Sequence, residues 1–149
     1  MPGWNIPVRK KKFEALIYDV KSPLDLKALG RYFKKILEIL PELKCFYWSI
    51  SVISDKQMEK LNFKFMNRNR PTDVLSFSYQ DGSIPLAEVI ISAEKAYENS
   101  VRFKTTPAEE LLMYLIHGIL HIMGYNDSES EEKKKMLTEQ DRILKELLK

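Results

Sequence analysis

The sequence predicts an α+β fold in which a small mixed β-sheet of about four strands packs against helices, with one central buried helix. Short apolar and β-branched stretches alternate with longer stretches of helical period along the chain. Residues 111–126 contain no Asp, Glu, Lys or Arg, so a helix there must be buried around most of its circumference. The turn signal Asp81-Gly82 joins two strand-like runs and predicts a hairpin.

The first half of the chain is predicted to contain two strands and two helices. The expected elements are a strand over 13–20, a helix over 24–40, a strand over 45–53, a helix over 54–66 and a loop over 67–71. Ser22 can cap the first helix, Pro23 suits its first turn, and Pro41 cannot continue it. Ser54 and Gln57 match a capping box, which predicts where the second helix begins.

The second half is predicted to contain a hairpin followed by three helices. The expected elements are strands over 73–79 and 84–92, a short helix over 93–100, the central helix over 107–123 and a final helix from about 128. Thr106 and Pro107 are typical of a helix start, and Gly124 of a helix end. Ser128 and Glu131 match a second capping box. The final helix is expected to turn these residues to the core: Met136, Leu137, Ile143, Leu144, Leu147 and Leu148.

Composition places the chain among ordinary globular proteins. Its 149 residues predict one domain, residues 1–149, and 30% charged residues with a net charge of +3 exclude collagen-like and disordered chains. Cys45 is the only cysteine, so the chain forms neither an internal disulfide nor a thiolate metal cage. No apolar run approaches the roughly 20 residues of a membrane span. We therefore expect a cytoplasmic protein with no membrane partner.

Both histidines of the chain lie on the predicted central helix. His117 and His121 are four residues apart, hence on one helical face. Each can be a core residue bonded to a neighbour, but burying two imidazoles in an apolar helix is unfavourable without partners, which favours one shared partner. Gly124 lets the chain turn and bring Asp127 back toward the imidazoles. The sequence therefore predicts one divalent metal ion, zinc being the first choice, with His117, His121 and Asp127 as ligands and an open fourth position.

The same spacing occurs in the zinc helix of metzincin peptidases, with an aspartate here as the third ligand. In zinc peptidases the residue after the first histidine is a glutamate that acts as the base. Here that residue is Gly118, which has no side chain. A metallopeptidase is therefore kept only as an alternative.

Three segments carry a resemblance to a known family. They are residues 117–127 (His-Gly-Ile-Leu-His-Ile-Met-Gly-Tyr-Asn-Asp), residues 61–62 with 70–77 (Leu-Asn, then Arg-Pro-Thr-Asp-Val-Leu-Ser-Phe) and residues 86–92 (Leu-Ala-Glu-Val-Ile-Ile-Ser). In these the chain resembles the YbeY-type single-strand endoribonucleases that mature ribosomal RNA in bacteria. The resemblance implies a metal-dependent endoribonuclease of rRNA maturation and ribosome quality control. Its implied partners are single-stranded or ribosomal RNA and the ribosome or its proteins.

Two positions depart from the family pattern. The family's third histidine is Asp127 here, so nickel or another transition metal also suits the site. The family's arginine, which is thought to act on the RNA phosphate, is Met66 here. Its role can pass to Arg68 or Arg70, because guanidinium groups bind phosphate oxygens in a fork. Met66 also favours a second alternative, a noncatalytic ribosome-associated binding protein.

The segment after these arginines is expected near the metal cleft. Thr72, Asp73 and Ser76 either support the metal site or are ordinary turn and strand residues, and the sequence leaves both interpretations open.

Overall fold

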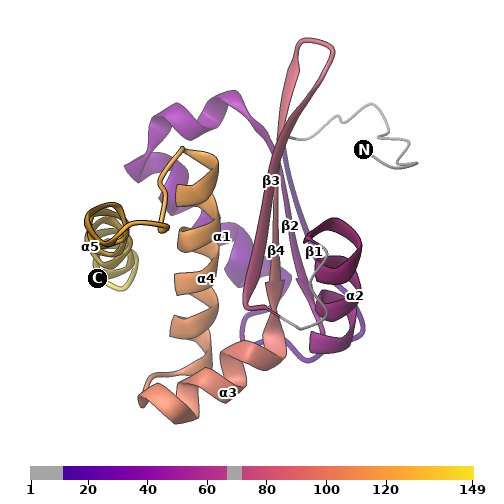
Figure 1. The fold of residues 1–149 in the computed structure, drawn as a ribbon, viewed down its shortest axis with the longest axis vertical. Coiled ribbons are helices and arrows are strands. Elements are labelled where there is room, and N and C mark those ends of the chain that lie inside the picture. The colour runs from indigo at the N-terminus through magenta and orange to yellow at the C-terminus, as the bar shows by residue number, and fades with distance from the viewer. Residues whose placement is uncertain (1–11, 67–71) are drawn as a thin grey trace.

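The computed structural model describes residues 12–66 and 72–149 and has an α+β fold (Figure 1). Its elements are β1 (Phe13–Ile17), α1 (Leu26–Ile39), the 3₁₀ helix η1 (Pro41–Cys45), β2 (Tyr47–Ile53), α2 (Asp55–Met66), β3 (Val74–Asp81), β4 (Ile84–Ser92), α3 (Ala93–Phe103), α4 (Pro107–Ile122) and α5 (Ser130–Leu147). The sheet formed by the described residues has the strand order β1-β2-β4-β3. β2 pairs in parallel with β1 and β4, whereas β3 and β4 form an antiparallel hairpin. The predicted mixed sheet of about four strands is confirmed.

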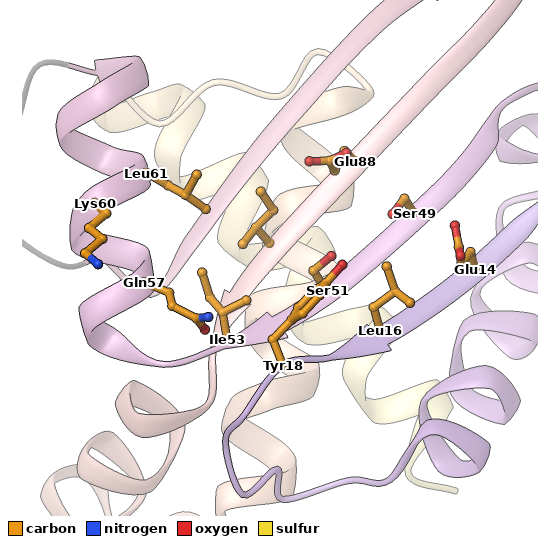
Figure 2. A pocket seen from close by; sticks show the side chains of 11 residues that line it. Glu14, Leu16, Tyr18, Ser49, Ser51, Ile53, Gln57, Lys60, Leu61 and Glu88 are labelled. Carbon is orange, nitrogen blue, oxygen red and sulfur yellow. The ribbon is translucent and has the colours of Figure 1, made fainter. Parts of the chain in front are cut away.

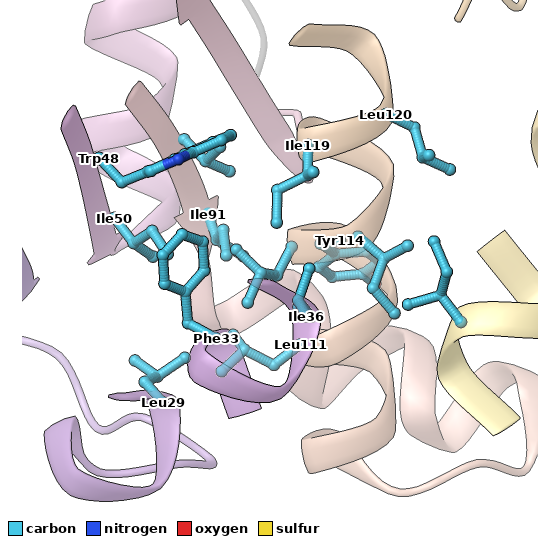
Figure 3. Close-up of a cluster of buried hydrophobic side chains, with 14 of the residues drawn as sticks. Leu29, Phe33, Ile36, Trp48, Ile50, Ile91, Leu111, Tyr114, Ile119 and Leu120 are labelled. Carbon is cyan, nitrogen blue, oxygen red and sulfur yellow. The ribbon is translucent and has the colours of Figure 1, made fainter. Parts of the chain in front are cut away.

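The main core lies between one face of the sheet and α1, α4 and α5, whereas α2 packs on the other face (Figure 1). Figure 3 shows α1 and α4 side chains meeting residues of β2 and β4. Trp48, the largest buried side chain of the described residues, donates its indole N–H to the carbonyl oxygen of Leu43 at 2.8 Å. This bond satisfies the one polar group that Trp48 brings into the core.

The central helix α4 is buried over most of its surface, as its uncharged sequence predicts. Its residues Leu111, Leu115, Ile119 and Leu120 are fully buried in the main core. At Gly118, α4 lies so close to the sheet that a Cβ atom would be 2.7 Å from Val89 Cγ1 of β4 and 2.8 Å from Ser76 Oγ of β3. The short distance follows from the absence of a side chain at this position.

Two of the predicted helix starts are confirmed by their hydrogen bonds. Thr106 Oγ1 accepts the backbone N–H of Glu109 at 3.1 Å and caps α4. Ser54 Oγ accepts the N–H of Gln57 at 3.2 Å, and Gln57 Oε1 accepts the N–H of Ser54 at 3.2 Å. This reciprocal pair is the capping box expected before α2.

The predicted cap of α1 is wrong. Asp25 caps this helix, because its Oδ1 atom accepts the N–H of Ala28 at 2.8 Å. Ser22 instead closes a local turn with its hydroxyl and the backbone of Leu24. Helix α1 therefore begins two residues later than expected, although it ends before Pro41 as predicted.

The predicted start of α5 is also wrong. The N–H of Ser128 donates to Asn126 Oδ1 at 2.8 Å, which forms an Asx turn and keeps this segment out of the helix. Helix α5 begins at Ser130, with Glu129 as an N-cap that makes no side-chain bond. Of the six expected core residues, Met136, Ile143 and Leu147 are buried and Leu144 is partly buried against the core; Leu137 and Leu148 are exposed.

The remaining boundaries differ by a few residues. β1 ends at Ile17, and β2 begins at Tyr47 because the preceding residues form η1. α3 continues to Phe103, beyond its expected end. No helix within residues 12–66 and 72–149 combines the length and hydropathy that crossing a bilayer requires.

A cavity of 480 Å³ lies on the α2 side of the sheet (Figure 2). Glu14, Ser49 and Glu88 line it from three neighbouring strands, where the sheet register places them in one row. Ser49 and Glu88 are buried polar residues. No described residue lines both this cavity and the one that contains the histidines.

Candidate metal centre

Three side chains converge at the C-terminal end of α4. The Nε2 atoms of His117 and His121 are 3.1 Å apart. The Oδ2 atom of Asp127 lies 3.6 Å from each of them. In the described part of the chain, His117, His121 and Asp127 are the residues whose ligand atoms lie close enough together, within 4.8 Å of one another, to hold a metal ion.

The turn after α4 brings Asp127 to the histidines. Gly124 has a φ of 101°, a left-handed conformation that glycine adopts without strain. The N–H of Tyr125 donates to the carbonyl of Leu120, and the N–H of Gly124 to the carbonyl of His121, each at 3.0 Å. This pair of bonds is a Schellman motif. The predicted helix end and return of the chain at Gly124 are confirmed.

Hydrogen bonds on the far side of each ring define which nitrogen is free. Nδ1 of His121 donates to the backbone carbonyl of Tyr125 at 3.2 Å, and Nδ1 of His117 donates to Oε1 of Gln140 at 2.8 Å. The backbone carbonyl of Tyr125 can only accept, so Nδ1 of His121 carries the proton, and the amide oxygen of Gln140 matches the same tautomer for His117. Each Nε2 atom then presents a lone pair. Two lone pairs and one carboxylate oxygen therefore face one another, an arrangement that a cation stabilises.

The distances fit a metal ion. Zinc–nitrogen bonds of about 2.0–2.1 Å in a tetrahedral site place two ligand atoms about 3.3 Å apart. The observed separations of 3.1 and 3.6 Å lie on either side of this value. The three side chains remain partly exposed, so a further coordination position is accessible from solvent. The donor set therefore fits one divalent ion with an open position.

The site opens into a cavity of 410 Å³ between α4 and β3. Its lining residues are Asn62, Thr72, Asp73, Val74, Leu75, Ser76, Phe77, His117, His121 and Asp127. The predicted proximity of the histidines to the start of β3 is thus confirmed for residues 72–77. The predicted phosphate contacts Arg68 and Arg70 lie outside the described residues.

Ser76 has a definite contact with the helix that carries the histidines. Its hydroxyl donates to the carbonyl oxygen of Gly118 at 2.9 Å. Thr72 and Asp73 also line the cavity, with 3.4 Å between the Thr72 hydroxyl and Oδ1 of Asp73. Of the two interpretations left open by the sequence, a supporting role is therefore favoured for Ser76.

Sequence reasoning missed Gln140, and it assigned no role to Asn62 although residues 61–62 carry part of the family resemblance. Gln140 contacts His117 from α5, 23 residues further along the chain, and no local motif marks it. Asn62 lines the cavity from α2 and is buried. Both residues are polar and lie among the inward-facing residues of an amphipathic helix, and this is the sequence pattern by which they could have been found.

Comparison with known proteins supports one family. The model of the family described as endoribonuclease YbeY matches residues 17–148. The endoribonuclease YbeY of Borrelia duttonii is 36% identical over 142 residues, which cover 85% of this chain and 96% of the relative. That of Neorickettsia sennetsu is 34% identical and covers 90% of this chain and 96% of the relative.

A solved structure has a similar fold. The solution structure of TM1509 from Thermotoga maritima matches with a TM-score of 0.66 and 28% identity, over 91% of this chain and 88% of that one. The family match spans nearly the whole chain, including every residue of the metal centre. The chain therefore belongs to the endoribonuclease YbeY family.

Proposed function

We propose that this protein is a metal-dependent endoribonuclease that cleaves single-stranded RNA in ribosomal RNA maturation and ribosome quality control. The observation that carries the proposal is the convergence of three metal-ligating atoms beside an open cavity, in a chain of the endoribonuclease YbeY family. The cavity provides room for a phosphodiester next to the ligand atoms.

His117, His121 and Asp127 are the proposed ligands of one divalent ion, zinc in the first place, with nickel or another transition metal as further candidates. When bound, such an ion supplies Lewis-acid stabilisation of the negative charge on a phosphoryl oxygen. The carboxylate of Asp127 leaves the loaded site with one positive charge fewer than a third imidazole would. Arg68 and Arg70 are the proposed phosphate contacts.

The metallopeptidase alternative is disfavoured by the packing at Gly118. A Cβ atom at this position would lie 2.7 Å from Val89 Cγ1 and 2.8 Å from Ser76 Oγ. A glutamate base after the first histidine therefore has no space in this fold, because side chains of β3 and β4 already occupy the place of its Cβ atom.

The proposed partners are single-stranded and ribosomal RNA and the ribosome, and the proposed location is the cytoplasm. The noncatalytic alternative, a ribosome-associated binding protein, is favoured by Met66 in the place of the family's arginine. The two proposals differ in one outcome, which is whether bound RNA is cut.

The experiment is a cleavage assay on labelled single-stranded RNA. The protein is first stripped with a chelator and then supplied with zinc, nickel or manganese, with duplex RNA and an unstructured peptide as comparison substrates. We expect slow cleavage of single-stranded RNA only with metal, and loss of cleavage in His117→Ala with RNA binding retained.

Arginine variants test the proposed phosphate contacts. Arg68→Ala combined with Arg70→Ala should weaken RNA binding or cleavage, whereas Arg31→Ala, on the exposed surface of α1, is the matched control. Met66→Arg should raise the rate. RNA left intact for hours by both the wild type and Met66→Arg, with metal present, would contradict the nuclease proposal. RNA binding that persists in that case would favour the noncatalytic alternative.

A further inference from the structure

The metal centre depends on a contact from a different helix. Gln140 lies on α5, which packs on the main core through Met136, Ile143 and Leu147. Its side-chain oxygen accepts the Nδ1 proton of His117 at 2.8 Å. This is the hydrogen bond that directs the ring of His117 from the side opposite to the ligand atoms.

The two histidines are held by different kinds of acceptor. His121 donates to the backbone carbonyl of Tyr125, within the turn that Gly124 forms, so no side-chain substitution removes that acceptor. A carbonyl oxygen cannot donate, and the bond therefore keeps the proton of His121 on Nδ1. His117 has a side chain as its acceptor, so its tautomer depends on the residue at position 140.

The alternative tautomer of His117 would compete with the metal. If the proton of His117 lay on Nε2, that atom would donate to the Nε2 lone pair of His121, which is 3.1 Å away. This hydrogen bond would occupy the coordinating nitrogens of both rings. A metal ion would then have to break the bond and move the proton before it could bind.

We propose that Gln140 is a positioning residue that holds His117 in the Nδ1-protonated tautomer and thereby raises the metal affinity of the site. The inference rests on the proposed function, since it concerns the same metal site. Residues that bond to the far nitrogen of a ligating histidine typically change metal affinity by about 10–100-fold when they are replaced.

The first test measures zinc affinity at pH 8 by competition with a chromophoric chelator. Gln140→Leu removes the acceptor and should weaken zinc binding by about 10-fold or more. Gln140→Glu offers a stronger acceptor and should bind zinc more tightly than the wild type. Gln80→Glu makes the same charge change at an exposed position of β3 and should leave the affinity unchanged.

The second test reads the tautomer directly in the metal-free protein. Long-range proton–nitrogen NMR spectra distinguish the protonated from the unprotonated ring nitrogen, and the chain has only two histidines to assign. We expect His117 to carry its proton on Nδ1 in the wild type and in Gln140→Glu, and on Nε2 in Gln140→Leu. A structural role of Gln140 in packing α5 would not move the proton.

The outcomes separate the two proposals. The same His117 tautomer in all three proteins, or zinc affinities within twofold of one another, would overturn the role of Gln140. A wild-type protein that binds no divalent metal would overturn the proposed metal site, and the tautomer spectra would still decide whether Gln140 controls His117. Thermal unfolding of each variant identifies any that fails to fold. If Gln140→Leu fails to fold, the zinc affinity of Gln140→Glu relative to the wild type still tests the role of Gln140.

Discussion

Replacing Gly118 by alanine tests the contact between α4 and the sheet. The added Cβ atom would lie 2.7 Å from Val89 Cγ1, 2.8 Å from Ser76 Oγ and 3.1 Å from Val74 Cγ2. These atoms belong to two strands, so either α4 or these strand side chains must shift to relieve the overlap. The movement also weakens the 2.9 Å hydrogen bond from Ser76 to the carbonyl of Gly118.

Two opposing effects set the change in the free energy of unfolding of Gly118→Ala. Overpacking a core costs about 1–3 kcal/mol, and three close contacts place this site at the upper end of the range. Alanine is favoured over glycine in a helix by about 1 kcal/mol. We therefore expect Gly118→Ala to lower the free energy of unfolding by about 2 kcal/mol, since the steric term exceeds the helix term.

The assay is urea denaturation, with Gly30→Ala as the matched control. Gly30 lies inside α1, and among the described residues its Cβ would meet only Phe13 Cε1, at an ordinary 3.7 Å. The control should therefore gain up to about 1 kcal/mol from the helix term alone. A Gly118→Ala protein as stable as Gly30→Ala would refute the packing argument.

Three further predictions concern other parts of the molecule. Asp127→His should raise the preference for zinc over manganese, measured by competition titration, because imidazole is a softer ligand than carboxylate; an unchanged preference would mean that Asp127 is not a ligand. Burial raises the pKa of the Glu110 carboxyl, so the ionised form is disfavoured in the folded protein and stability is lost as the pH rises through that pKa. Glu110→Gln should therefore be more stable than the wild type in urea at pH 8 and lose this advantage at pH 4, and a pH-independent difference would contradict this. Asp25→Ala should cost about 1 kcal/mol in urea, because it removes the cap of α1, and an unchanged midpoint would show that the cap contributes nothing.

Local sequence signals predicted helix starts and ends correctly where all the residues involved lie within a single turn. The capping box at Ser54 and the Thr106 cap use hydrogen bonds within a single turn, so their residues suffice to predict them. The helix end at Gly124 follows from the conformational freedom of one residue. The three proposed ligands also lie within one short segment, and their convergence could therefore be predicted from spacing.

Predictions were wrong where two nearby residues compete for one role. Ser22 and Asp25 both have side chains that cap helices; Asp25 caps α1, whereas the Ser22 hydroxyl bonds the backbone of Leu24. Ser128 resembles a cap, but the side chain of Asn126 engages its N–H first. Periodicity alone could not separate Leu137 and Leu148 from the buried residues of α5, because the width of the buried stripe depends on how closely α4 and α1 approach.

Gly118 links the fold to the chemistry of the site. Because Gly118 has no side chain, α4 can lie directly on β3 and β4. This contact sets the distance between the sheet and the residues on either side of Gly118. His117 is one of those neighbours, and His121 follows one turn later on the same face. The same absence removes the position that a peptidase would use for its base. The close helix–sheet contact and the lack of a glutamate base thus have one cause, so the packing at Gly118 argues against the peptidase independently of the family comparison.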